Sequence, residues 1–450
     1  MAVPVHGPAD HAASLPRLPH AVRRAGVGAG SIGPTIGAVA LVGAVLTSLT
    51  LAAGGSSRRL LFFVPASLSG FPGWMRGPLS GLDLGLGPST ASLLLIVLCA
   101  GYGLALANAR HVGLRYALGA VGCAQLAFML AAPLYSADIF GYLDYARLAV
   151  LHGVDPYVHG AAAAPHDAVR RYVRWRDTAT PYGPVFTIAT YPLAWLGVPA
   201  AFWTLKVFAC AASLGVVALV ARIARQLARP VVPAVLFVGL NPVLLAYGVG
   251  GGHNDFFAVL VALAGVTLAL DGHERGASAG FVIAAAVKAP AGIALAFLLI
   301  AQRSRRAMFA AVAAAAGVAL TASLAFDSAG LGLVGQFVGQ QRLVARLSVP
   351  NLVARGLGLD GVTPIVRVVA TAILVAGVAA LLWRVWHGAD WLAASGWATL
   401  LVLLTSAWLV PWYVIWLLPI AAVAGDARLR AAALAFTAFV VITHVAAYVV

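Results

Sequence analysis

One carboxylate in the chain is placed to act on a hydroxyl group. Asp138 directly follows an apolar run, and Tyr142 and Tyr145 come four and seven residues later. A helix from Asp138 to Leu151 would hold all three side chains on one face. A carboxylate beside apolar surface has a raised pKa and can serve as a general base. The alternative is a helix N-terminal carboxylate that only accepts backbone N–H groups.

Three adjacent polar residues form the second candidate group. His253, Asn254 and Asp255 follow a run of three glycines and precede an apolar segment. Glycines let the backbone approach a ligand closely, and the polar side chains could bind sugar hydroxyls. The same residues could instead cap the following helix. The sequence leaves both interpretations open.

Several cations lie in or beside apolar segments. Lys288 lies inside an apolar run, where a lysine is costly unless it reaches the headgroups or pairs with an anion such as a phosphate. Lys206 is closer to the end of its run, so we expect it to reach toward the headgroups. Arg342 and Arg346 could face a phosphate, or they could line a solvated helix face.

Aromatic side chains surround Pro411, with Trp412 and Tyr413 next to it. They could form a platform for a sugar ring or belong to an interfacial aromatic belt. The chain contains no P-loop, no HExxH motif and no DxD pair. We therefore expect neither a metal nor another cofactor.

The composition shows which elements must position these residues. Of 450 residues, 62% are hydrophobic and only 10% are charged, which excludes a soluble protein. The 29 basic residues outnumber 14 acidic ones, but they punctuate apolar runs instead of forming solvated basic stretches. This pattern favours membrane anchoring and contact with membrane lipid, and no nucleic-acid partner is expected.

Uncharged runs predict an all-α polytopic membrane protein, a bundle of about 11–13 transmembrane helices. The run Trp391–Gly425 should divide at Pro411, and residues 276–300 should form a hairpin of two broken helices at Lys288. Residues 184–197 should be interfacial. The remaining expected spans are Ile32–Gly54, Gly87–Ala107, Tyr116–Leu134, Pro199–Ala221, Val231–Val249, Phe256–Leu270 with Asp255, Ala307–Phe326, Val368–Trp383 and Ala431–Val450.

Arginines in alternate connections predict the orientation. With Arg23 and Arg24 inside, residues 1–31 form a cytoplasmic tail and residues 32–450 a single membrane domain. Two long loops, residues 135–198 and 327–364, are then extracytoplasmic and carry short interfacial helices. Because anchoring does not require their many charges, we expect the chemistry at the plasma membrane's outer face.

The order of several short motifs resembles the polyprenol-phosphate-mannose-dependent α-1,6-mannosyltransferases of actinobacterial envelopes, within the GT-C glycosyltransferase superfamily. The resemblance runs from about Ser136 to Pro419. Its motifs are Asp138–Tyr142 with Arg147 and Gly153, Asp155–Tyr157, Trp175 with Thr180–Pro184, Asn241–Pro242, Gly251–Asp255, Val287–Lys288, and Pro411–Trp416 with Pro419.

The resemblance implies a GT-C-like fold and mannosyl transfer, with inversion, from a polyprenyl-phosphate donor to a lipid-linked mannan or other glycan. It implies Asp138 as the general base. The implied substrate-binding residues are Tyr142, Arg147, Tyr157, Tyr182, His253, Asn254, Asp255, Lys288, Arg342, Arg346, Trp412 and Tyr413. Ala146 replaces an expected glycine, and Asp138 has Ile139 beside it where many relatives have a second acid.

Three other functions remain open from the sequence. Arabinofuranosyltransferases use similar membrane donors. A lipid or sugar transporter would also have broken helices and charges inside apolar segments, although its ionisable residues should lie near the membrane midplane. A structural partner of other envelope enzymes would not need Asp138.

Overall fold

The computed structural model describes residues 32–56, 72–82, 84–326, 339 and 342–449. The chain divides into two units, residues 1–32 and 33–450, and all helices below belong to the second unit except for the first residue of α1. The predicted cytoplasmic tail, including Arg23 and Arg24, and residues 327–338 and 340–341 of the second predicted outer loop lie outside the described residues.

Helices long and apolar enough to cross a membrane form the framework. Within the described part of the chain there are six of them. They are α1 (Ile32–Gly54), α2 (Pro88–Ala107), α6 (Val198–Gln226), α11 (Arg305–Ala325), α14 (Pro364–Trp386) and α17 (Ala427–Val449).

Shorter apolar helices pack among these spans. They are α3 (Leu114–Met129), α8 (Asp255–Leu270), η9 (Ala289–Gly292) with α10 (Ile293–Gln302), α15 (Trp391–Thr405), and η10 (Pro411–Tyr413) with α16 (Val414–Val423). The other helices are η2 (Gly73–Met75), η3 (Pro78–Leu82), η4 (Ala109–His111), α4 (Asp138–His152), η5 (Ala161–Ala163), η6 (Arg170–Tyr172), α5 (Pro184–Ala189), η7 (Tyr191–Trp195), α7 (Val231–Gly239), the π-helix η8 (Leu244–Val249), α9 (Glu274–Val287) and α13 (Val349–Gly356).

The predicted all-α polytopic class is confirmed, since the described residues contain helices and no strand. The expected 11–13 membrane helices stay a prediction, because only the six long helices meet the length requirement. The expected breaks occur: α9 ends before Lys288, α10 packs back against α9, and α15 and α16 are separated at Pro411.

Two predicted spans were wrong in extent. The run Val231–Val249 is not one helix, because α7 ends at Gly239 and η8 starts at Leu244. Asn241 Oδ1 accepts the N–H groups of Val243 and Leu244 at 3.0 and 3.2 Å, and Pro242 has no N–H to continue the helix. The span predicted to end at Leu134 ends at Met129 instead, and the Leu134 N–H bonds to the carbonyl of Gly250.

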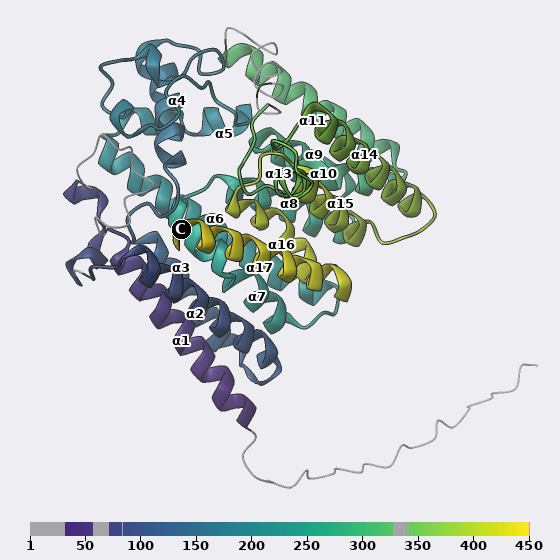
Figure 1. The fold of residues 1–450 in the computed structure, drawn as a ribbon. Helices are drawn as coiled ribbons and strands as arrows, with labels where there is room; N and C mark the ends of the chain where they lie inside the picture. Colours follow the sequence, from purple (N-terminus) through teal and green to yellow (C-terminus); the bar gives the residue numbers. More distant parts are fainter. Residues whose placement is uncertain (1–31, 57–71, 83, 327–338, 340–341, 450) are drawn as a thin grey trace, which may run out of the picture. The chain divides into compact units, whose positions relative to one another are not determined.

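Helices α8, α9 and α15 each pack against several other helices of the bundle (Figure 1). Helix α8 packs against α6 and α9, α9 packs against α11, and α15 packs against α10, α14 and α16. Small buried residues such as Ala277 and Ala284 on α9 let neighbouring backbones approach closely. These contacts place the ends of α8 and α9 near the turn before α16.

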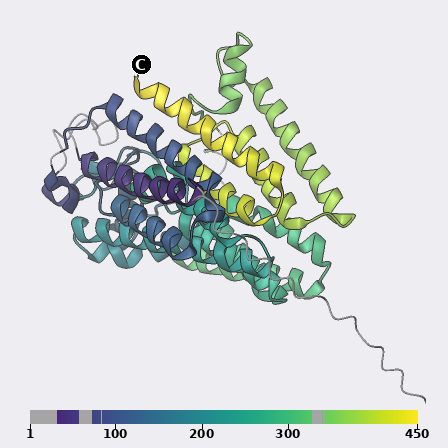
Figure 2. The ribbon, with the colours of Figure 1, turned by 90° about the horizontal axis from the view of Figure 1, so that it is seen from below.

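Helix α14 lies at the edge of this unit in both views (Figures 1 and 2). Val385 is the one buried residue of this helix, and side chains such as Val368 and Ile373 are exposed. In a bilayer such a surface contacts acyl chains. One side of the bundle is therefore open to lipid.

Candidate active site

Asp138 is the first residue of α4, and the Ser136 hydroxyl accepts its backbone N–H at 3.1 Å. Its carboxylate remains 23% exposed. Burial raises the pKa of Asp138 to about 6, the positive charge of Lys288 opposes this rise, and the negative charge of Asp255 adds to it. A carboxylate with this pKa can exchange a proton near neutral pH.

His253 lies next to this carboxylate, with Nδ1 3.6 Å from Asp138 Oδ2. The imidazole is fully buried and stacks on the indole of Trp412, with ring centroids 3.8 Å apart. Burial and then the charge of Lys288 lower the pKa of His253 well below the usual value, which favours the neutral ring. Among the described residues, Nε2 has no hydrogen-bond partner.

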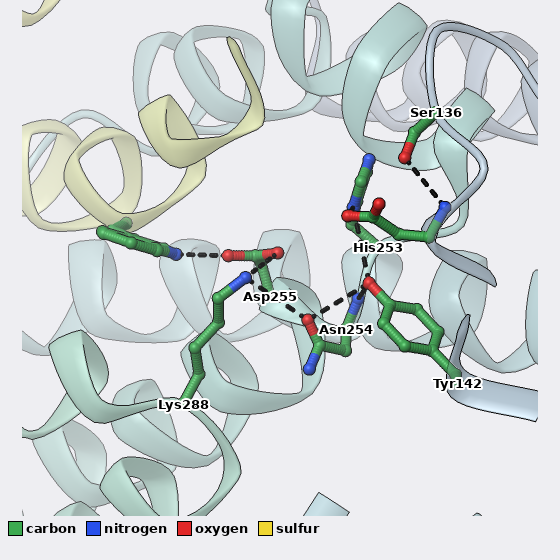
Figure 3. Close-up of polar contacts among 8 residues, drawn as sticks. Ser136, Tyr142, His253, Asn254, Asp255 and Lys288 are labelled. Atoms are coloured by element: carbon green, nitrogen blue, oxygen red, sulfur yellow. Dashed lines mark hydrogen bonds and ion pairs between the residues drawn. The ribbon is translucent and has the colours of Figure 1, made fainter. Parts of the chain in front are cut away.

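Tyr142 connects α4 to the segment before α8 (Figure 3). Its hydroxyl lies 3.5 Å from His253 Nδ1, and it donates to Asn254 Oδ1 at 3.3 Å. The Asn254 backbone N–H donates back to the same hydroxyl at 3.3 Å. The predicted one-turn spacing from Asp138 thus places Tyr142 beside the His253–Asn254 pair.

Lys288 pairs with a buried anion and does not reach toward the headgroups. Its amine lies 2.8 Å from Asp255 Oδ2 and donates to Asn254 Oδ1 at 3.4 Å. Asp255 is fully buried, and the indole N–H of Trp416 donates to its other oxygen. The amine also lies 5.1–5.8 Å above three aromatic rings, those of Tyr413, Trp416 and Tyr182.

The backbone next to Lys288 fixes this arrangement. Lys288 is extended (φ −155°), so α9 ends at Val287. The N–H of Gly183 donates to the Val287 carbonyl at 3.1 Å. A Cβ at position 183 would lie 2.0 Å from the carbonyl oxygen of Ala286, so only glycine fits. This contact brings Tyr182 over the lysine.

A cavity of about 820 Å³ leads away from Lys288. At the Lys288 end it is lined by aromatic side chains, those of Tyr182, Tyr413 and Trp416. Toward α14 its lining becomes apolar, with one cation, and includes Ile293, Arg367, Ala370, Leu374 and Val402. The cavity therefore has Lys288 and aromatic rings at one end and runs along α14, a helix with exposed apolar side chains.

The described structure gathers most of the predicted site residues. Asp138, Tyr142, His253, Asn254, Asp255, Lys288, Trp412 and Tyr413 form one network of hydrogen bonds, ion pairs and ring contacts, and Tyr182 packs edge-on against Tyr142. Tyr157 lines the cavity, and its hydroxyl donates to the Tyr182 carbonyl at 2.7 Å. Within the described residues, no group of three His, Cys, Asp or Glu side chains could hold a metal ion.

Three predicted arginines are not part of this network. Arg147 donates through Nε to both oxygens of Asp167, at 2.9 and 3.1 Å, and so holds the loop after α4. Arg342 and Arg346 are exposed, as a solvated face would require. Their backbone carbonyls accept hydrogen bonds from Arg367 and Asn351.

The structure gives three residues positions and contacts that the sequence analysis did not predict. Arg367 lines the cavity, and its signal is a cation in the first turn of an apolar helix whose other cation, Arg384, lies in the last turn. Trp416 belongs to the aromatic motif after Pro411, but its bond to Asp255 joins segments 161 residues apart. Lys206 does not reach toward the headgroups, because it is fully buried and donates to two backbone carbonyls.

Fold and site together define a class: an all-helical, multi-pass membrane protein with a carboxylate–histidine pair near a large cavity that contains a lysine. Residues 84–304 match the model of the N-terminal domain of alpha-(1->6)-mannopyranosyltransferases, and residues 343–447 match that of the MptB C-terminal domain. The chain belongs to this alpha-(1->6)-mannopyranosyltransferase family.

Relatives from two actinobacteria show the extent of the similarity. The chain is 32% identical to alpha-(1->6)-mannopyranosyltransferase A of Mycobacterium tuberculosis over 68% of this chain and 65% of that protein. It is 27% identical to alpha-(1->6)-mannopyranosyltransferase A of Corynebacterium glutamicum over 57% of this chain and 60% of that protein. The match thus spans less than two thirds of either relative. No solved structure matches the chain.

Proposed function

We propose that the protein is a glycosyltransferase that moves mannose from a polyprenyl-phosphate donor to a lipid-linked mannan or glycan acceptor. The observation that carries the proposal is the series of contacts from Asp138 through His253, Tyr142 and Asn254 to Lys288, which lines a cavity of about 820 Å³. The names of the relatives support mannose as the sugar and α-(1→6) as the linkage.

The cavity has the chemistry that a polyprenyl-phosphate sugar requires. An ammonium carries three donors, and Asp255 and Asn254 take two of those of Lys288, which leaves one for a phosphate oxygen. Arg367 adds a second positive charge to the same cavity. The isoprenoid chain would follow the apolar lining of α10, α14 and α15 toward the lipid.

The proposed transfer needs a group that accepts the acceptor's proton and a leaving group that takes the electron pair from C1. Asp138 accepts the proton from an acceptor hydroxyl, and that oxygen forms the new bond to C1 of mannose. The bond from C1 to the phosphate oxygen breaks, and the polyprenyl phosphate leaves with the electron pair. Inversion at C1 gives an α-linked product only if the donor is β-linked, so the donor is the β-linked polyprenyl-phosphate mannose.

Electrostatics and positioning supply the catalysis. Lys288 stabilises the negative charge on the leaving phosphate, Arg367 adds a positive charge elsewhere in the same cavity, and the buried His253 ring holds one side of the base. Holding two lipid-linked substrates in one site replaces a bimolecular encounter by an oriented one. General base catalysis by Asp138 contributes roughly 10²- to 10⁴-fold.

We place the reaction on the outer face of the plasma membrane, because the arginine distribution favours an outer position for the first long loop. The test is cysteine labelling in intact cells, in a variant whose own cysteines are replaced. An impermeant maleimide should label Asp177→Cys in this loop and leave Arg428→Cys unlabelled. The opposite labelling would contradict the orientation.

A direct assay tests the transfer. Purified protein in nanodiscs is incubated with β-linked polyprenyl-phosphate mannose and a short α-mannoside, and the new linkage is determined by NMR. We expect an α-(1→6) bond, with no transfer from the α-linked donor. Transfer from polyprenyl-phosphate arabinose alone would instead favour an arabinofuranosyltransferase. Transfer from neither donor would contradict the enzymatic proposal.

A further inference from the structure

Lys206 is a buried lysine that the proposed reaction does not use. It belongs to α6, no part of it is exposed, and its Nζ lies 3.0 Å from the Phe128 carbonyl and 3.0 Å from the Gly250 carbonyl. A buried amine is costly unless it makes such bonds. The bonds reach two segments far from each other in the sequence, the end of α3 and the turn after η8.

The Gly250 carbonyl has a second donor, which extends the connection to the candidate base. The backbone N–H of Leu134 also donates to this carbonyl, at 3.2 Å. Leu134 begins the segment that leads through Ser136 to Asp138, and Gly250 begins the turn that leads to His253. One carbonyl oxygen therefore joins both chain segments whose side chains meet at the Asp138–His253 pair.

The backbone on both sides of this junction is constrained. Tyr135 has a left-handed conformation (φ 61°), which costs energy for a residue other than glycine, and its ring stacks on that of Tyr247 in η8. Gly252 is also left-handed (φ 68°), and a Cβ there would lie 3.0 Å from Ile139 Cδ1 and 3.6 Å from Lys206 Cδ. A left-handed residue and a close packing contact therefore flank the junction on each side.

We propose that Lys206 is a positioning residue, whose amine holds the Leu134–Asp138 segment and the Gly250–His253 turn in the register that brings Asp138 to His253. It acts through these segments and touches neither substrate. This inference rests on the proposed function for its effect on catalysis, but the junction itself has a separate physical signature.

The test compares Lys206→Met, which keeps the length and removes the donors, with Cys210→Ala, one turn further along the same helix. For Lys206→Met we expect kcat to fall roughly 10²-fold, as for other displacements of about 1 Å at a reacting group. The donor KM, set at Lys288, should remain close to the wild-type value. The acidic limb of the pH–rate profile should shift, while Cys210→Ala should keep the wild-type profile.

Hydrogen–deuterium exchange on the full chain in nanodiscs gives a readout that does not need activity. Faster exchange at Leu134 and in the turn 250–254 of Lys206→Met, with the rest of the bundle protected, would support the junction. Unchanged exchange in both segments, or a lowered melting temperature with a wild-type pH profile, would overturn it. If wild-type protein transfers no sugar, the proposed function fails while the exchange experiment still decides the role of Lys206.

Should Lys206→Met not fold, Gly252→Ala disturbs the same junction from the opposite side. Its Cβ would meet Ile139 in a backbone conformation that alanine rarely adopts. We expect the same shifted pH profile and the same local increase in exchange. A wild-type profile and wild-type exchange in Gly252→Ala would contradict the inference.

Discussion

Two clusters of charged side chains lie at opposite ends of α4. At the first residue, Asp138 meets His253 from a distant segment, and Lys288 and Asp255 form an ion pair close by. In the last turns, Arg147 and His152 both bind Asp167 from the following loop, with His152 Nε2 at 2.7 Å from Asp167 Oδ2. One helix thus carries both a candidate reaction centre and a structural clamp.

The clusters differ in how completely their atoms are paired. Although burial alone would raise the pKa of Asp167, hydrogen bonds from Arg147 and His152 lower it, so this carboxylate is satisfied as an anion. Asp138 keeps a raised pKa and 23% exposure. Saturated hydrogen bonding stabilises a loop, whereas a carboxylate with a raised pKa and an open side can exchange protons with a ligand.

The variant Asp138→Asn tests most directly whether Asp138, unlike Asp167, takes part in the reaction. We expect kcat to fall by roughly 10²- to 10⁴-fold, because the amide cannot accept the proton. The matched control is Asp144→Asn on the same helix. Burial and the charge of Asp167 raise the pKa of Asp144 to about 7, so a neutral side chain is tolerated there. Near-normal turnover by Asp138→Asn in the transfer assay would refute the assignment.

Lys288→Met separates donor binding from chemistry. We expect a donor KM at least roughly tenfold higher, since the phosphate loses a charge-assisted donor. Asp255 would also be left buried without its cation, a loss of about 3–5 kcal/mol in stability. The double variant Lys288→Met, Asp255→Asn should recover melting temperature but not donor affinity. An unchanged donor KM in both variants would remove Lys288 from the donor site.

The pH dependence should follow the raised pKa of Asp138. Because the carboxylate is the active form, kcat/KM should fall below pH of about 6, near the folded pKa, and not near 4. Lys288 lowers this pKa, so its removal should move the acidic limb upward. Asp255 raises it, so Asp255→Asn should move the limb downward. A limb that stays in place in both variants would mean that Asp138 does not control the rate.

At the other end of α4, Arg147→Met should affect stability more than catalysis. The loss of the bonds to Asp167 should cost about 1–3 kcal/mol, and His152 would retain part of the contact. Thermal unfolding and kinetics per folded enzyme measure the two effects separately. A large loss of kcat with a normal melting temperature would return Arg147 to the substrate site.

The smallest effects should come from Arg342→Ala and Arg346→Ala, because both side chains are exposed. Each should change stability by at most about 0.5 kcal/mol, and donor KM should stay near the wild-type value. Arg367→Ala is the positive control, since this arginine lines the cavity. If Arg342→Ala raised the donor KM as much as Arg367→Ala does, the exposed loop would bind the phosphate.

Sequence patterns predicted the elements because charges and prolines mark where apolar helices end. Asp138 starts α4, Lys288 divides α9 from α10, and Pro411 divides α15 from α16, all as expected. The break after α7 was missed although Pro242 stands there, because the apolar run continues across Asn241 and Pro242 and has the length of a single span.

Side-chain partners were less predictable, because they depend on tertiary contacts. A lysine in an apolar run has the same sequence signal whether it pairs with Asp255, as Lys288 does, or binds backbone carbonyls, as Lys206 does. Likewise, the charge of Arg147 does not reveal that Asp167, twenty residues away, occupies it. The sequence therefore predicted the types of the candidate site residues, but not which of their side chains are in contact.

The contact at Gly183 has a consequence for how this protein can vary. Any side chain at position 183 would collide with the Ala286 carbonyl and push the loop that carries Tyr182 away from the end of α9. The hydrogen bond from Gly183 to Val287, which fixes the backbone next to Lys288, would then be lost. Changes in donor preference should therefore arise elsewhere around the cavity. A saturation library at position 183 should yield only glycine among active clones, while positions such as Ala370 and Leu374 should accept many residues and select among isoprenoid chains.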